Sequence, residues 1–199
     1  MATIVLLMKA AFNVLSISTF ALLITAACNR NNHSSTVPEA LTQFRAEQDF
    51  YFKKNIGSPY YGKADFKGLS YFEFTPVWIV NCVFIEEPYV KIVSFTNTDG
   101  TLEEYRVMGK AILKHSSGID TLEVYKWFLP FYDATNGEAT YQGGRYLDVA
   151  PPASGKALQL DFNFAYHPMC VHDSVTACPL PPPHNVVRAR VEAGERLQN

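Results

Sequence analysis

The chain has 199 residues, of which 48% are hydrophobic and 14% aromatic, and its 17 basic and 19 acidic side chains leave a formal net charge of −2. This length and composition predict one ordinary domain with a sizeable apolar core. The near-neutral charge argues against the basic surface stripe with which proteins bind nucleic acid, so we expect no nucleic-acid partner.

The first 27 residues have the features of a bacterial export signal. An apolar run from about Val14 to Ala27 is shorter than the ~20 apolar residues that a membrane-spanning helix needs. It ends at Ala26-Ala27-Cys28, which resembles a lipoprotein processing site with Cys28 as the lipidated residue. A start at Met8 places Lys9 at the front, where a signal peptide carries its positive charge. We therefore predict a signal peptide over residues 1–27 with Met8 as the translation start.

The expected mature protein is a lipoprotein of the bacterial cell envelope. Its partner is the membrane, through the lipid on Cys28, and residues 28–37 form a polar tether on the periplasmic side. Asn29 follows the cysteine where Asp would favour retention in the inner membrane, so we expect the outer membrane. Removal of residues 1–27 takes away one charge, that of Lys9, and leaves a net charge of −3.

A helix is predicted directly after the tether. Thr36 is a suitable capping residue, Pro38 suits the first helical turn, and Glu39 follows Thr36 by three residues. Gly57 followed by Ser58-Pro59 marks the end. Between them a stripe recurs at helical spacing, formed by Leu41, Phe44, Gln48, Phe52 and Ile56.

From Trp78 onward the apolar pattern changes to a period of two, which is typical of β-strands. In the clearest case Leu158, Leu160, Phe162 and Phe164 share one face, opposite Gln159, Asp161 and Asn163. Strands are predicted over residues 78–85, 89–96, 102–114, 121–128, 157–164 and 186–191. The expected fold class for residues 38–199 is mainly β (α+β). It is a single β-rich domain whose antiparallel sheet is curled or closed into a barrel or roll, with one N-terminal helix.

Four sequence blocks carry a family resemblance. They are Gly-Gly-Arg-Tyr-Leu-Asp at 143–148, Asp-Phe-Asn with Tyr-x-Pro-x-Cys within 161–170, Cys-Pro-Leu-Pro-Pro-Pro-x-Asn at 178–185, and Ala-Gly-Glu at 193–195. Together they resemble the family known as domain of unknown function 1684, over about residues 41–195. The resemblance implies no established activity.

The polar residues of these blocks are the candidate ligand-binding residues. A cation, carboxylates and amides gathered in one cleft can bind a small polar molecule or an anionic group. Two other interpretations remain open: a solvated strand face, and a buried polar network that fixes the loops. The set consists of Arg145, Tyr146, Asp148, Asp161, Asn163 and Asn185.

Cys170 and Cys178 have three interpretations. In an exported protein they can form a disulfide that closes a short loop, worth ~2–3 kcal/mol in the chain-entropy model. They can also bind Zn²⁺ together with His167 and His172, although the spacing is not a standard zinc pattern. Cys170 can finally act as a nucleophile activated by a nearby histidine. The disulfide is the favoured interpretation, and Cys82, in the middle of a predicted strand, is expected to be a buried free thiol.

Three functions compete on this evidence. The favoured one is an envelope protein that binds a small polar ligand or a cell-envelope component. The alternatives are a hydrolase that uses Asp148 or Asp161 as general base or Cys170 as nucleophile, and a purely structural domain. In each case the segment 165–184, called the 165–184 loop below, is expected to be ordered and to cover one mouth of the barrel, with Arg145 and Asp148 beneath it.

Overall fold

The computed structural model describes residues 36–150, 152 and 157–198. The predicted signal peptide, Cys28 and the tether up to residue 35 lie outside the described residues. Among the helices that the structure describes, none is long and apolar enough to span a membrane.

Helix α1 (Glu39–Lys54) confirms the predicted N-terminal helix. Its N-cap is Pro38 and no side chain caps it, so the predicted role of Thr36 is not realised. Leu41 and Phe52 are buried, and the Phe44 ring packs on Phe164 with centroids 5.2 Å apart. Ile56 lies beyond the helix and is 80% exposed, so the apolar stripe ends one turn earlier than its spacing suggests.

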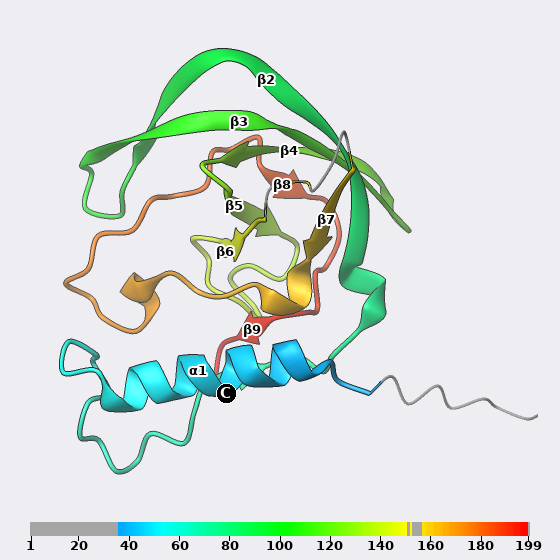
Figure 1. Cartoon of the computed structure of the whole chain (residues 1–199). Helices are drawn as coiled ribbons and strands as arrows, with labels where there is room; N and C mark the ends of the chain where they lie inside the picture. Colours follow the sequence, from blue (N-terminus) through cyan, green and yellow to red (C-terminus); the bar gives the residue numbers. More distant parts are fainter. Residues whose placement is uncertain (1–35, 151, 153–156, 199) are drawn as a thin grey trace, which may run out of the picture. The chain divides into compact units, whose positions relative to one another are not determined.

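The strands form two sheets (Figure 1). The larger has the order β6-β5-β4-β3-β2-β7, with β8 added in parallel to β5, and the smaller pairs β1 with β9. Their bounds are β1 Ser70–Tyr71, β2 Ile79–Thr96, β3 Leu102–His115, β4 Gly118–Tyr125, β5 Phe128–Asp133, β6 Arg145–Asp148, β7 Ala157–Asp161, β8 Val186–Val187 and β9 Glu195–Arg196. Short 3₁₀ turns, labelled η1 to η3, cover Pro76–Trp78, Phe162–Phe164 and Met169–Val171.

The predicted fold class is confirmed. The larger sheet curls into a half-barrel, with α1 as the single α-helix of the described residues (Figure 1). The buried side chains of its inner face form one core with the C-terminal segment, and Leu158, Leu160 and Phe162 of the clearest predicted strand belong to it. Apolar burial of this extent is the main force that holds the sheet in its curved form.

Several strand predictions differ from the structure. The strand predicted over residues 157–164 ends at Asp161, because Phe162–Phe164 form the 3₁₀ turn η2. Residues 78–85 and 89–96 belong to one strand, β2, whose register is interrupted between Glu86 and Lys91. Residues 121–128 are divided by a tight turn at Lys126 and Trp127, whose φ angles of 47° and 63° suit a primed hairpin turn. Lysine and tryptophan are not turn-forming residues, so no local residue pattern predicts this hairpin. Of residues 186–191 only β8 is a strand.

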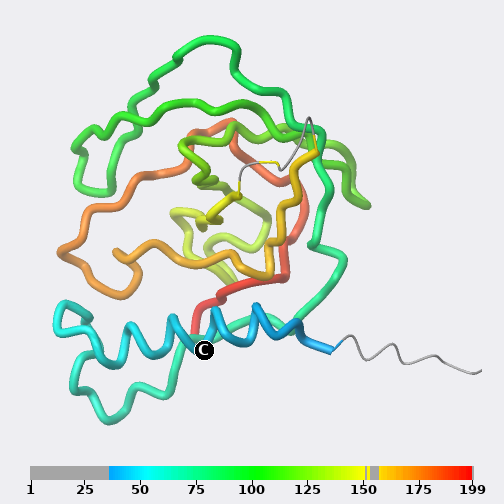
Figure 2. The backbone as a smooth tube through the Cα atoms, in the orientation of Figure 1, coloured from blue at the N-terminus to red at the C-terminus, as the bar shows by residue number. Residues whose placement is uncertain are grey.

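The 165–184 loop lies against the β6 end of the sheet and the β2–β3 hairpin (Figure 2). Tyr166 exchanges backbone hydrogen bonds with Tyr146, both at 2.9 Å. Further along, the Leu180 N–H donates to the Thr96 carbonyl at 2.9 Å, and the Thr98 N–H donates to the Cys178 carbonyl at 2.9 Å. These contacts fix the path of a long segment that has little regular structure of its own.

Candidate functional site

Strand β6 divides the predicted ligand-binding residues between two faces. Successive side chains of a strand point in opposite directions, so neighbours in the sequence cannot share a face. Arg145 is fully buried toward the core. The Tyr146 hydroxyl instead donates to the Pro179 carbonyl at 2.6 Å, and the Asp148 carboxylate accepts a hydrogen bond from Tyr166 at 2.9 Å. Tyr146 and Asp148 thus face the 165–184 loop and Arg145 does not.

Arg145 has a structural environment. Its Nη2 donates to the Asp133 carboxylate at 2.8 Å and to the Val191 carbonyl at 2.7 Å. Its Nη1 donates to the carbonyls of Ala193 and Glu195. Burial lowers the pKa of Arg145, while the Asp133 carboxylate acts in the opposite direction. The guanidinium therefore ties β6 to the C-terminal segment and is not accessible to a ligand.

Asn163 and Asn185 are fully buried and connect distant segments. Asn163 accepts the Thr75 N–H at 3.0 Å and donates to the Thr75 carbonyl at 2.9 Å. Asn185 accepts the Glu123 N–H at 2.9 Å and donates to the carbonyls of Glu123 and Pro130. Each side chain satisfies backbone groups as a neighbouring strand would.

Asp161 and Asp148 have separate hydrogen-bond partners. Asp161 accepts the Asn163 N–H at 3.0 Å and caps η2. Within the described residues, no hydrogen bond connects Asp161 to Asp148, whose partner is Tyr166.

An aromatic cleft lies between α1, the β6 end of the sheet and the 165–184 loop. Its volume is about 370 Å³, and the loop contributes His167, Met169 and residues 176–179 to its lining. Its rings pack edge to face, with centroids of Phe128 and Tyr146 4.7 Å apart and those of Tyr146 and Tyr166 5.9 Å apart. The aromatic lining residues are Tyr51, Phe52, Tyr105, Phe128, Tyr146 and Tyr166.

A second cavity of about 380 Å³ lies along β2 and the Leu180–Pro183 run. Its acidic residue, Glu123, already contacts Lys91 at 3.2 Å, the Tyr125 hydroxyl at 2.8 Å and His184 at 3.2 Å. Because these partners satisfy the carboxylate, we regard the aromatic cleft as the better candidate site.

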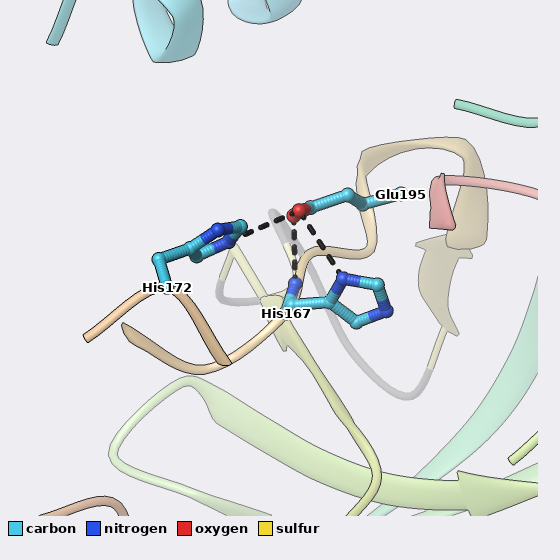
Figure 3. Close-up of side chains that lie close together, drawn as sticks. All are labelled: His167, His172 and Glu195. Carbon is cyan, nitrogen blue, oxygen red and sulfur yellow. Dashed lines mark hydrogen bonds and ion pairs between the residues drawn. The ribbon is translucent and has the colours of Figure 1, made fainter. Parts of the chain in front are cut away.

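His167 and Glu195, which line the aromatic cleft, form a buried cluster with His172 (Figure 3). The His167 N–H donates to Glu195 Oε2 at 2.8 Å, and His167 Nδ1 lies 3.2 Å from Oε1. The Tyr141 N–H donates to His167 Nε2 at 3.3 Å. Since Nε2 accepts this bond, the proton of a neutral His167 is on Nδ1, where it is donated to Glu195.

His172 is less well satisfied. Its Nδ1 lies 3.3 Å from the Tyr60 hydroxyl. Its Nε2 lies 3.2 Å from Glu195 Oε1, yet the direction of this contact does not suit a hydrogen bond. Among the residues that the structure describes, this buried nitrogen has no hydrogen-bond partner. The His172 side chain is only 7% exposed.

Glu195 carries a buried negative charge. Burial raises the pKa of this carboxyl, but the hydrogen bonds from the His167 side chain and backbone outweigh that effect and lower the pKa to about 2. Its backbone is positioned by Gly194, whose φ of +77° and close approach to the Ala165 carbonyl leave no room for a Cβ atom.

The cysteine predictions have mixed outcomes. Cys170 and Cys178 are free thiols, so the predicted disulfide is not formed. The Cys170 N–H donates to Cys178 Sγ at 3.1 Å, and burial is the main cause that raises the pKa of Cys178 to about 12. Cys82 is a buried free thiol, as predicted, and burial raises its pKa to about 12. The described group with metal-ligand geometry contains His167, His172 and Glu195 and neither thiol.

Comparison with known proteins identifies the family of this chain. The family model described as "Protein of unknown function (DUF1684)" matches residues 64–196. The chain belongs to the DUF1684 family. This DUF1684 chain is also similar to a solved structure, the solution NMR structure of the uncharacterized protein from gene locus rrnAC0354 of Haloarcula marismortui. The two are 30% identical with a TM-score of 0.64, over 79% of this chain and 92% of that chain. No curated protein matches.

Sequence reasoning missed Glu195 as a site residue of this DUF1684 chain. It treated Ala193-Gly194-Glu195 as a family block only and considered His167 and His172 as partners of the cysteines. The signal that could have identified Glu195 is a charged residue directly after Gly194, in a block whose other residues are small and uncharged.

Proposed function

We propose that this protein binds a small molecule in the aromatic cleft. The observation that carries the proposal is a cavity of about 370 Å³ whose aromatic walls are held in place by ring packing and by the 165–184 loop. Small-molecule sites have volumes of roughly 300–1,000 Å³, mostly apolar walls and a few polar groups.

The cleft favours a particular class of ligand. Aromatic rings bind flat apolar faces, so a sugar or a heteroaromatic ring with a hydrogen-bonding edge fits the walls. The only acidic residue in the described lining, Glu195, is ionised, and Asp148 lies next to Tyr166. Because Arg145 is buried elsewhere, we expect a neutral or cationic ligand rather than an anion.

The proposed setting is the cell envelope. It rests on the sequence of residues 1–28, which is typical of a lipoprotein signal with Cys28 as the lipid attachment site. In this setting the protein presents the cleft on the periplasmic side of the outer membrane, where a cell-envelope component is an available ligand.

Two neighbouring aromatic residues of α1 provide the test. Tyr51 lines the cleft and Phe50 does not; both are exposed at the surface, at 43% and 67%. Neutral sugars, nucleosides, amines and carboxylic acids are screened by thermal shift and saturation-transfer NMR. Tyr51→Ala is expected to weaken a genuine ligand about 2- to 10-fold, the value of one aromatic contact, and Phe50→Ala to leave it unchanged.

Equal effects of the two variants, a preference for anions, or no binding by any class would overturn the proposal.

A further inference from the structure

We propose that His167, His172 and Glu195 bind a divalent transition-metal ion such as Zn²⁺. This site does not depend on the ligand of the aromatic cleft. One ligand atom from each residue lies within 4.8 Å of the other two. Both nitrogen-to-oxygen distances, from His167 Nδ1 and His172 Nε2 to Glu195 Oε1, are 3.2 Å. Zinc bonds of about 2.0–2.1 Å in a tetrahedron place neighbouring ligand atoms about 3.3 Å apart, so these distances suit one ion.

The second observation is the unpartnered nitrogen of His172. When the His172 proton is on Nδ1 and is donated to the Tyr60 hydroxyl, the lone pair of Nε2 faces Glu195 Oε1, and two acceptors meet at 3.2 Å. A cation between them removes this repulsion and compensates a carboxylate that is only 3% exposed. Tyr60 then holds the ring of a ligating histidine, as outer partners do in metal sites.

Metal binding has a structural consequence at Tyr141. Ligation through His167 Nδ1 moves the proton to Nε2, which now accepts the Tyr141 N–H at 3.3 Å. Two donors would then face each other, so this contact must break on binding. The Tyr141 amide is therefore a specific reporter for His167 as a ligand.

Space for a further ligand is present on both sides of the cluster. His167 and Glu195 line the aromatic cleft, and all three residues line a separate cavity of about 170 Å³ together with Tyr60. Three protein ligands with an open fourth position are the arrangement of catalytic rather than structural zinc. Such an ion can polarise a bound group or activate a water molecule.

The test uses the purified full chain. Zn²⁺ binding is measured by calorimetry, Co²⁺ binding by its visible absorption, and the Tyr141 amide by NMR. We expect one ion per chain, tetrahedral Co²⁺ bands without a thiolate charge-transfer band, and a shift of the Tyr141 amide.

Three variants separate this site from others. His172→Gln is expected to weaken binding more than about 100-fold, because the loss of an outer partner alone costs about 10- to 100-fold. His184→Gln is the matched control, since His184 also lies 3.2 Å from a glutamate, Glu123, but belongs to no three-residue group in the described chain. Tyr60→Phe, which leaves all three ligands in place, is expected to weaken binding about 10- to 100-fold.

The proposal is overturned if the folded wild-type chain binds neither ion, or if His172→Gln binds as the wild type does. It is also overturned if binding is lost in Cys170→Ser, which would assign the ion to the thiols. If His172→Gln does not fold, Tyr60→Phe decides, and unchanged affinity there rejects the site.

Discussion

Replacement of Arg145 by methionine tests whether the buried guanidinium stabilises the fold or binds a ligand. Methionine has a similar length but no charge and no donor. The variant leaves the Asp133 carboxylate in the core with its remaining donors, the Thr135 N–H at 2.8 Å, the Thr135 hydroxyl at 2.6 Å and the Val191 N–H at 3.2 Å, all of which donate to Oδ1. It also removes the side-chain donor from the backbone carbonyls of residues 191, 193 and 195.

The expected loss of unfolding free energy is about 3–5 kcal/mol, the usual effect of removing one partner from a buried ion pair. Both side chains are fully buried, so solvent does not screen the pair. A domain is stable by about 5–15 kcal/mol, so the variant stays folded only by a small margin. At roughly 2–4 °C per kcal/mol for this chain length, its melting temperature falls by about 6–20 °C.

The assay is urea unfolding followed by the fluorescence of Trp78 and Trp127. The double variant with Asp133→Asn is expected to recover part of the loss, since it no longer has an uncompensated buried carboxylate. Arg190→Met is the matched control, because Arg190 forms its ion pair with Glu138 at the surface and should change stability far less. An Arg145→Met protein with wild-type stability but no small-molecule binding would refute the structural role and return Arg145 to the ligand site.

Three further predictions follow from buried polar groups. Asn185→Ala should cost about 2–3 kcal/mol in urea unfolding, because it leaves buried backbone groups of Glu123 and Pro130 without partners; a loss below about 0.5 kcal/mol would contradict this. Glu195, whose pKa is lowered from its ordinary value of 4.5 to about 2, should contribute about 3 kcal/mol of stability above pH ~4.5, and this contribution is lost as the pH falls toward 2. Glu195→Gln should flatten this pH dependence, whereas the exposed control Glu138→Gln should not. In thiol alkylation followed by peptide mapping, the half-buried Cys170 should react well before Cys82 and Cys178, because the pKa values of about 12 of these two thiols disfavour the reactive thiolate. Equal alkylation rates would contradict this prediction and show that Cys82 and Cys178 become exposed readily.

The sequence predicted the fold class because periodicity reports burial directly. The alternation of Leu158, Leu160 and Phe162 and the helical spacing of Leu41 and Phe52 correspond to buried faces. Local residue types could not predict the Lys126-Trp127 turn, because the pairing of β4 with β5 imposes its backbone conformation. The parallel pairing of β8 with β5 joins segments more than 50 residues apart and left no local signal.

The candidate site was harder to predict because polarity does not distinguish a ligand-binding residue from a buried anchor. Arg145, Asn163 and Asn185 are polar residues of these blocks, yet each is fully buried and bonded to backbone groups. Alternation alone could have separated Arg145 from Tyr146. The pairing of Glu195 with His167 depends on the way that the C-terminal segment passes the 165–184 loop, which tertiary packing decides.

One edge of strand β2 is not paired with another strand of the described residues along much of its length. β7 pairs with it only over Ile79–Val83, and within the described residues no other strand borders that side of the following stretch. An open row of backbone donors and acceptors can recruit a strand from another molecule. Here Pro88 lacks a donor, Glu86 and Glu87 add like charges, and the interrupted register bends the strand. These residues therefore disfavour edge-to-edge pairing between neighbouring molecules.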